Sequence, residues 1–456
     1  MLPELVIAQK LLLLALGIPL TSLALMLRKN KNKLATSRLG GIKDMGRLNG
    51  TDGLILSRKF MLTFKKSLEG TMVVAPTGEG KTTSIFLPNL LSNSLPKSSL
   101  IIGDPKGELF DLTSKYQLSI GRTPLLFEPL GNHAKYNLLE NCEGFTEVRE
   151  LASNLIINGG SGKRGEYFEE SGIPCFTSAL LNSKNISQAV KFLINTPLNE
   201  IINILGNNNN ADIKEQFRVF MASAESPKTM SSITSTLLTN LQLWTDHKLI
   251  NTTSKSDFKP IDLRNKPIAL YIKYDTSRSK YLAPFLSVFY TQLIDKIMHN
   301  KGLPVLFFLD ELQNLGKINN FEETVSMCRS EEVGFLVCMQ NISKLFEIYG
   351  ENNATTILNN LKSKVILPSI SDYKTLSYLS NLCGDKQFTG ESTTGDKKTY
   401  SQVVKKLYTP DEIRRINDEM ALLICHNKLP FLDKQNIYYK QSKYYNNVPV
   451  ELKEKS

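Results

Sequence analysis

The feature that most constrains the fold is the apolar run at residues 71–75, which ends in a glycine-rich turn closing on Gly80-Lys81-Thr82. A turn of this kind between a strand and a helix presents backbone N–H groups to an anion, at the positive end of the helix. In such loops a lysine reaches the β- and γ-phosphates and the following hydroxyl binds Mg²⁺. The stretch therefore predicts a site for ATP and Mg²⁺, with Lys81 on the phosphates and Thr82 on the metal. The predicted nucleotide-binding residues are Ala75, Pro76, Thr77, Gly78, Glu79, Gly80, Lys81, Thr82 and Thr83.

One position departs from the P-loop pattern. Ala75 stands where the first glycine of the motif is usual. An alanine fits there only if the backbone keeps a negative φ, because Cβ makes positive φ unfavourable. A chance match or a decayed loop is the alternative to a nucleotide site.

A second apolar run, at residues 302–309, ends in Asp310-Glu311. A continuous run rich in β-formers is typical of a strand buried on both faces, and two acids at its end are costly to desolvate. The cost is explained if Asp310 holds Mg²⁺ and Glu311 positions or deprotonates the water that attacks the γ-phosphate. An ordinary surface turn after a core strand is the alternative.

Further apolar runs alternate with helical stretches, which predicts a mainly parallel α/β sheet with crossover helices. The candidate strands are 72–75, 100–103, 268–273, 305–309, 335–339, 365–367 and 422–425. The phosphate loop, Asp104, Asp310 and Gln340 all follow such strands, at the edge where parallel sheets bind ligands. Between residues 142 and 258, helical periodicities such as 145–157 and 231–244 replace the strand pattern, which predicts an inserted all-α domain.

The net charge of +11 lies mostly near the N-terminus. Residues 1–70 hold 12 Lys/Arg against 4 Asp/Glu, which leaves only +3 for the remainder. An apolar-to-neutral stretch at 11–27 precedes Arg28, Lys29, Lys31 and Lys33. This order predicts a single transmembrane helix with the body of the protein on the cytoplasmic side. A cleaved signal peptide and an amphipathic or partner-bound helix are the alternatives.

The motifs together resemble the TraG-like coupling proteins of type IV secretion, a family of conjugative DNA-transfer ATPases. The resemblance runs from about residue 53 to 439. It is carried by the phosphate loop, by the segments at 100–110, 307–317 and 339–345 with Tyr349-Gly350, and by 407–414.

The resemblance implies a RecA-like core that assembles into a ring, expected to be a hexamer, at the bacterial inner membrane. Its implied partners are DNA bound without sequence preference, a relaxase–DNA complex and the channel proteins of the secretion system. A ring also supplies a cation from a neighbouring subunit to the γ-phosphate, and Arg329 is the candidate. A salt-bridged arginine at a helix end is the alternative. Gln340 would sense the γ-phosphate or orient water, so the predicted catalytic residues are Lys81, Glu311, Gln340 and Arg329.

The predicted organisation is a membrane anchor (1–30), a basic linker (31–52), the first part of the nucleotide-binding domain (53–141), an all-α insertion (142–258), its second part (259–440) and a tail (441–456). The family usually has two membrane helices and often a longer C-terminal tail, whereas only one candidate span is found here. The leading functional hypothesis is a ring ATPase that drives conjugative DNA transfer. The alternative is a receptor that uses nucleotide as a switch and recruits protein substrates without pumping DNA. Another ring ATPase, such as a chromosome-segregation or pilus-assembly motor, stays open.

Overall fold

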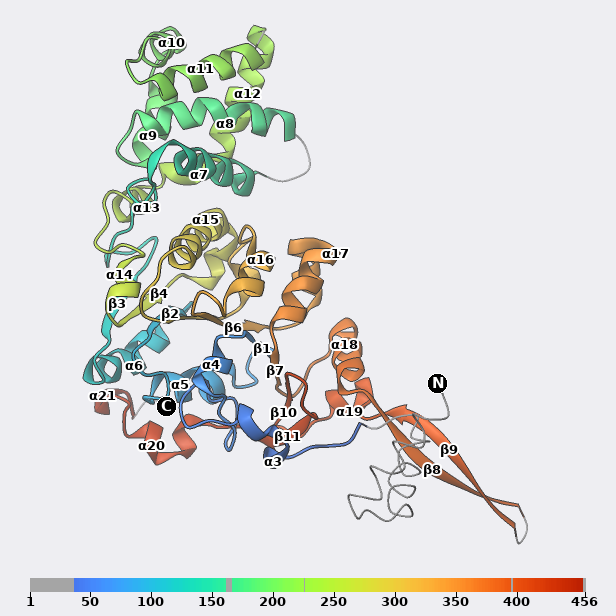
Figure 1. Ribbon diagram of the computed structural model, residues 1–456. Coiled ribbons are helices and arrows are strands. Elements are labelled where there is room, and N and C mark those ends of the chain that lie inside the picture. Colours follow the sequence, from blue (N-terminus) through green and yellow to red (C-terminus); the bar gives the residue numbers. More distant parts are fainter. Residues whose placement is uncertain (1–36, 161–165, 225, 395–396, 454–456) are drawn as a thin grey trace, which may run out of the picture.

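A nine-stranded sheet forms the centre of the molecule (Figure 1). The computed structural model describes residues 37–160, 166–224, 226–394 and 397–453. The strand order is β11-β10-β7-β1-β6-β5-β2-β4-β3. The strands are β1 (Thr71–Val74), β2 (Ser99–Gly103), β3 (Thr123–Phe127), β4 (Ile268–Ile272), β5 (Val305–Leu309), β6 (Val333–Met339), β7 (Ser363–Ile366), β10 (Met420–Cys425) and β11 (Phe431–Lys434).

The sheet is mainly parallel, as predicted. Neighbouring strands from β7 to β3 pair in parallel, whereas β10 pairs antiparallel with β7 and β11. Strands β1, β2, β4, β5 and β6 are buried along their whole length. Their continuous apolar sequence follows from this, because both faces of the sheet are covered.

Successive side chains of each strand enter two different cores. Met72, Ile101 and Phe307 belong to one, while Val73, Leu100 and Phe308 belong to the other. Helices α15 (Ser279–Met298), α16 (Phe321–Met327) and α17 (Ser343–Asn360) cover the first face (Figure 1). Helices α5 (Leu87–Leu90) and α6 (Glu108–Ser119), with the segment 45–62, cover the second. This two-faced packing fixes the sheet and leaves the ends of its strands to form a site.

A cluster of helices stands apart from the sheet, above α15 in Figure 1. Side chains of Asn185, Asn210, Ser226 and Asp246 each accept a backbone N–H at a helix start. The asparagine run at 207–210 thus ends in a helix cap, a role that the sequence alone did not indicate. The cluster contains α7 (Gly144–Gly159), α8 (Glu166–Leu181), α9 (Ile186–Asn195), α10 (Leu198–Gly206), α11 (Ala211–Ser223), α12 (Pro227–Asn240), η3 (Gln242–Thr245) and α13 (His247–Thr252).

A two-stranded hairpin, β8 (Asp385–Thr394) and β9 (Lys397–Lys406), extends from the end of the molecule opposite the helical cluster (Figure 1). The remaining elements are short or lie at the edges of the sheet. They are α3 (Ile42–Met45), η1 (Gly46–Leu48), α4 (Phe64–Ser67), η2 (Thr82–Phe86), α14 (Asp262–Asn265), η4 (Thr276–Arg278), η5 (Leu312–Asn314), α18 (Tyr373–Cys383), α19 (Pro410–Arg414), η6 (Tyr438–Lys440), α20 (Ser442–Tyr445) and α21 (Val450–Lys453).

Each of the seven predicted strands is present, with ends that differ by no more than two residues. Strands β3 and β11 and the hairpin were not anticipated. The predicted membrane helix falls within residues 1–36 and lies outside the described residues. Among the helices of the described ranges, none has both the length and the apolar character that a membrane span requires.

Candidate nucleotide-binding site

The phosphate loop connects β1 to the short helix η2 at the carboxyl end of the sheet. Gly78 and Gly80 have φ values of 89° and 84°, which side chains with a Cβ rarely adopt. A Cβ at Gly80 would lie 3.2 Å from Thr83 Oγ1 and 3.3 Å from Gln435 Oε1. Ala75 does not take a positive φ, and its N–H donates to the Met339 carbonyl at 3.0 Å. The backbone at residue 75 therefore accommodates alanine in place of the usual glycine.

The strand order places four polar positions in a row. Strands β1, β6, β5 and β2 are neighbours. Their carboxyl ends carry the phosphate loop, Gln340, the pair Asp310–Glu311, and Asp104. Carboxyl ends of parallel strands meet at one edge, so residues more than 200 positions apart in sequence face one site.

Lys81 lies at the centre of this site. Its side chain is only 8% exposed, and Nζ lies 3.2 Å from Glu311 Oε1 and 3.9 Å from Asp310 Oδ1. Gln340 Nε2 donates to the same Glu311 oxygen at 3.0 Å. Two predicted catalytic residues, Lys81 and Gln340, thus both contact a third, Glu311.

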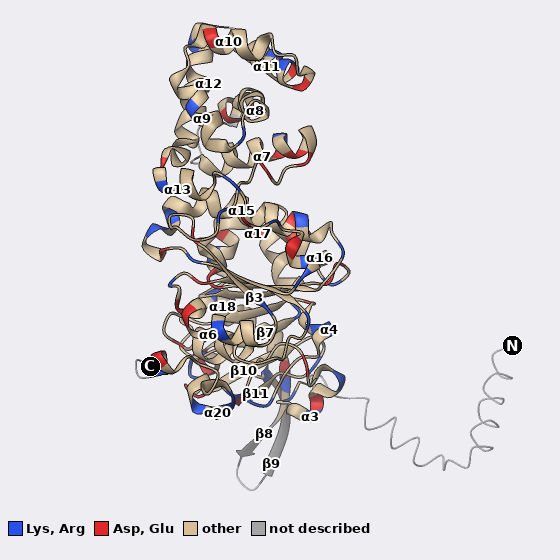
Figure 2. Ribbon diagram, turned by 90° about the vertical axis from the view of Figure 1, so that its left-hand side faces the viewer, with Lys and Arg blue, Asp and Glu red and all other residues tan. Residues whose placement is uncertain are grey.

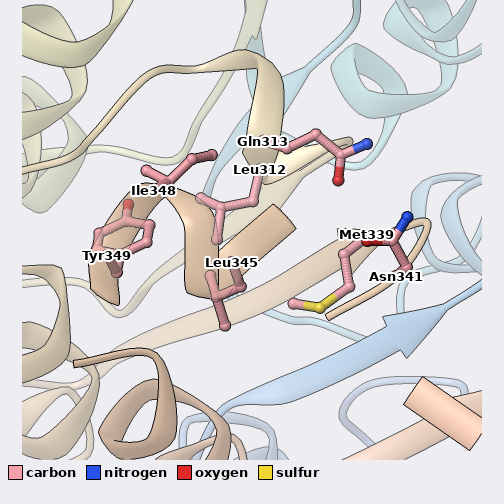
Figure 3. A pocket seen from close by; sticks show the side chains of 7 residues that line it. All are labelled: Leu312, Gln313, Met339, Asn341, Leu345, Ile348 and Tyr349. Atoms are coloured by element: carbon pink, nitrogen blue, oxygen red, sulfur yellow. The ribbon is translucent and has the colours of Figure 1, made fainter. Parts of the chain in front are cut away.

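The Glu311 carboxylate is held on its other side as well. Asn314 Nδ2 donates to Glu311 Oε2 at 2.6 Å, and the Glu311 backbone has a φ of 56°. A non-glycine residue in this region is uncommon and is maintained only when its surroundings enforce it. Figure 3 shows what lies behind the turn: a small pocket whose apolar lining includes Leu312 and Leu345 and whose polar lining includes Gln313. Leu312 is 1% exposed, and its burial anchors the turn that orients Glu311.

The pKa values of the two acids are shifted in opposite directions. Burial raises the pKa of Asp310 to about 6, with the Lys81 charge opposing the shift and the charges of Glu311 and Asp104 adding to it. Burial also acts to raise the pKa of Glu311, but hydrogen bonds from Gln340 and Lys81, together with the Lys81 charge, lower it overall. The surroundings of Glu311 therefore favour its ionised form, whereas Asp310, when ionised, bears a desolvation cost that its neighbours do not compensate.

Asp310 fits the role of a metal ligand. Its Oδ1 is buried and accepts no hydrogen bond from the described residues. A buried carboxylate oxygen without a donor is costly, and a hard cation such as Mg²⁺ would remove that cost. Thr82, the other predicted metal ligand, is half-buried at the start of η2.

Asp104 has a structural role. Its two carboxylate oxygens accept the N–H groups of Leu109 and Phe110 at 3.1 and 2.8 Å, at the start of α6. Burial raises its pKa to about 6, with these two bonds opposing the shift. It caps a helix beside the site, the simple role that its sequence position indicated.

Arg329 is not brought to the phosphate loop of its own chain. It follows α16 and precedes β6, at the amino end of the strands, and Nη1 lies 3.1 Å from Glu69 Oε1. The Glu69 carboxylate also contacts Lys66 and His426. The Arg329 side chain is 54% exposed, so it lies at the surface. Action on a neighbouring subunit stays a prediction.

Two residues at the site were missed from the sequence. Asn314 orients Glu311 and stands three residues after it, within reach through the turn of η5. Gln435 lies against Gly80, and its own Nε2 donates to the Asp418 carbonyl at 2.8 Å. Gln435 directly follows β11 and lies more than 350 positions after Gly80, so no local sequence pattern indicates that the two residues meet.

A phosphate loop on one strand, paired acids two strands away and a polar strand end between them define a P-loop α/β protein. A sequence profile described as "Type IV secretory system Conjugative DNA transfer" matches residues 23–455. The chain therefore belongs to this family, the coupling proteins of type IV secretion.

Relatives and solved structures agree with this assignment. The chain is 29% identical to the VirD4 protein of Rhizobium radiobacter over 399 residues, which cover 81% of this chain and 57% of the relative. It is 21% identical to the probable conjugal transfer protein TraG of Sinorhizobium fredii (strain NBRC 101917 / NGR234), covering 81% and 62%. The chain thus spans about three-fifths of the length of these relatives.

The fold resembles that of the bacterial conjugative coupling protein TrwB. The unbound form matches with a TM-score of 0.73 and 16% identity, over 88% of this chain and 92% of that one. TrwB in complex with the ATP analogue ADPNP matches with a TM-score of 0.68 and 16% identity, over 89% and 95%. At this identity the likeness shows the shared fold.

Proposed function

We propose that this protein is an ATP-hydrolysing coupling protein that drives DNA, or DNA with bound protein, into a type IV secretion channel. The observation that carries the proposal is the contact of Lys81 with Glu311, beside an Asp310 oxygen that accepts no hydrogen bond from the described residues. VirD4 and TraG relatives and a TrwB structure with ADP and Mg²⁺ support it.

The residues divide the chemistry among themselves. Lys81 would leave Glu311 and bind the β- and γ-phosphates, while the N–H groups around Gly78 and Gly80 hold the phosphate chain. Thr82 and Asp310 would hold Mg²⁺, which neutralises charge on the phosphate oxygens. Glu311, once free of Lys81, would accept the proton of the attacking water or hold that water in line.

Gln340 links nucleotide state to the sheet. Its amide bonds Glu311 directly from the end of β6, the strand between the loop and the acids. A γ-phosphate that draws Lys81 away would leave Gln340 as the remaining short contact of Glu311 Oε1. We expect Gln340 to report hydrolysis to the rest of the subunit in this way.

The proposal extends to an assembly. A hexameric ring would bring Arg329 of one subunit to the phosphates of the next, and the ring would sit at the inner membrane, anchored by residues 1–30 with its body in the cytoplasm. DNA would be bound through phosphates, without sequence preference. The relaxase–DNA complex and channel proteins would be its partners.

The test is the rate of ATP hydrolysis by the full chain, measured without DNA, with single-stranded DNA and with double-stranded DNA. Each rate is measured at a series of salt concentrations that begins at low salt. DNA should stimulate turnover, and the stimulation should weaken as salt rises. If the assembled protein hydrolyses ATP at a rate that DNA does not change, DNA is excluded as the polymer that the motor moves directly.

The small charge excess of +3 beyond residue 70 favours one competing function, a nucleotide-switched receptor for protein substrates. Glu311→Gln separates the two in a transfer assay. A motor with this change should bind ATP and stop delivering cargo, with turnover reduced by about 10²-fold or more. A receptor should still deliver, because it needs nucleotide bound but not cleaved.

A further inference from the structure

The β8–β9 hairpin projects from the body as a ribbon, and β9 lies against α18 at its root (Figure 1). An isolated two-stranded ribbon is marginally stable in water, and both of its outer edges carry unpaired backbone groups. A projecting ribbon with ten-residue strands is therefore expected to be stabilised by a further contact.

The pairing register separates the residues near the root into two unlike faces. Lys386 pairs with Lys405, and Phe388 pairs with Val403. Directly paired residues of an antiparallel ribbon share a face, so these four form what we call the basic face. Phe388 and Val403 are 41% and 39% exposed, and Lys386 Nζ lies 4.9 Å from the Phe388 ring centre.

On the opposite face a lysine is paired with an acid of the hairpin itself. Asp385 pairs with Lys406, and their charged groups lie 3.2 Å apart. On the basic face two lysines stand directly opposite each other without an acid in the register between them, an arrangement that is unfavourable by itself. An anionic surface against this face would attract both lysines and so offset the repulsion between them.

The root of the hairpin lies where the described chain begins. The Ser37 N–H donates to the Asp385 carbonyl at 3.1 Å, and Ser37 Oγ donates to the Cys383 carbonyl at 2.6 Å. Residue 27, the end of the apolar stretch, is ten positions before Ser37 in the sequence. Ten residues span at most about 35 Å, which is close to the length of about 34 Å expected for β8. A hairpin of that reach can touch the membrane that holds such an anchor.

We propose that the basic face of the hairpin lies on the anionic lipid headgroups of the membrane, on the cytoplasmic side. Lys386 and Lys405 would contact the headgroups, and Phe388 would enter the interface as aromatic side chains do. The neutral face would point to water. The contact would fix the orientation of the sheet, with the helical cluster at the far end of the molecule from the hairpin (Figure 1). Figure 2 shows the same cluster beyond α15, on the side of the sheet away from α20. This inference rests on the membrane anchor of the proposed function.

Lipid is favoured over nucleic acid as the occupant by two observations. The tie of Ser37 to the root joins the hairpin to the segment that follows the apolar stretch. The pair of exposed apolar side chains beside the lysines suits an interface with an apolar interior, whereas a phosphate backbone offers them nothing.

The test is amide hydrogen exchange of the hairpin in the full chain, held in nanodiscs of phosphatidylcholine alone or mixed with phosphatidylglycerol. Exchange should slow by about tenfold in the anionic discs. Lys386→Gln with Lys405→Gln should abolish the slowing. Lys228→Gln with Lys248→Gln, which removes equal charge from exposed positions of the helical cluster, should leave it intact.

Equal exchange in the two lipids would overturn the inference. Slowing by added double-stranded DNA in phosphatidylcholine discs, with none from anionic lipid, would overturn it in favour of a nucleic-acid contact. Retention in the discs and ATP turnover are recorded on the same samples, so a failed ATPase is seen separately from an unprotected hairpin. A chain that is not retained would overturn both the anchor and the contact.

Discussion

The replacement Asp310→Asn should stabilise the nucleotide-free protein, and the gain should depend on pH. The fold raises the pKa of Asp310 from 3.8 to about 6. The raised value means that the native state favours the protonated acid, so stability falls as pH rises between these two values and stays lower above them. The difference between these two pKa values corresponds to about 3 kcal/mol, and asparagine carries no such cost.

The measurement is urea unfolding of the full chain followed by circular dichroism, without nucleotide or Mg²⁺. Near pH 4 the variant should be about as stable as the natural protein, or less stable by the cost of the unpaired amide donors that asparagine introduces. Above about pH 7 the variant should be more stable by about 1–3 kcal/mol. Asp418→Asn, at an exposed acid, is the matched control and should change little. A variant that is no more stable than the natural protein above about pH 7, or equally stabilised at both pH values, would refute the reasoning. The gain should come with a loss of Mg²⁺-dependent turnover, because the acid that strains the fold is the proposed metal ligand.

Two further changes test the loop and the assembly. Gly80→Ala should weaken ATP binding by about tenfold or more in calorimetry, because φ of 84° is unfavourable with a Cβ and Thr83 and Gln435 crowd the added atom. Gly78→Ala, where a Cβ meets nothing within 4 Å, should cost less, and equal losses would argue against crowding. Arg329→Ala should abolish turnover while preserving ATP binding, and mixing it with Lys81→Ala subunits should restore part of the rate. No recovery from mixed rings would count against a role in the neighbouring site.

The central strands could be predicted because burial on both faces leaves a strong signal. The runs that became β1, β5 and β6 are continuously apolar and end at polar residues that mark the site. β3 was missed because it is an edge strand of mixed burial with Pro124 in it, a residue that edge strands tolerate. β11 was missed for a similar reason, since Phe431–Lys434 is short and polar at one end.

The site was predictable as far as local motifs carry it. Lys81, Asp310, Glu311 and Gln340 each follow a recognisable strand, and strand order then brings them together. Sequence could not show that Lys81 contacts Glu311, because that contact depends on the positive φ of Glu311 and on the packing beneath its turn.

The hairpin also left no usable signal in the sequence. Its strands are largely polar in sequence and lack the continuous apolar run that is typical of a buried strand. Pattern analysis that depends on burial therefore passes over it.

The account depends most directly on nucleotide being held by Lys81 and cleaved with the help of Glu311. The measurement is equilibrium binding of ATP with Mg²⁺ to the full chain, compared among the natural protein, Lys81→Ala and Glu311→Gln, with hydrolysis followed in the same samples. The natural protein should bind and cleave ATP, Glu311→Gln should bind at least as tightly without cleaving, and Lys81→Ala should lose binding by about tenfold or more. Unchanged ATP affinity in Lys81→Ala, or full hydrolysis by Glu311→Gln, would contradict the account.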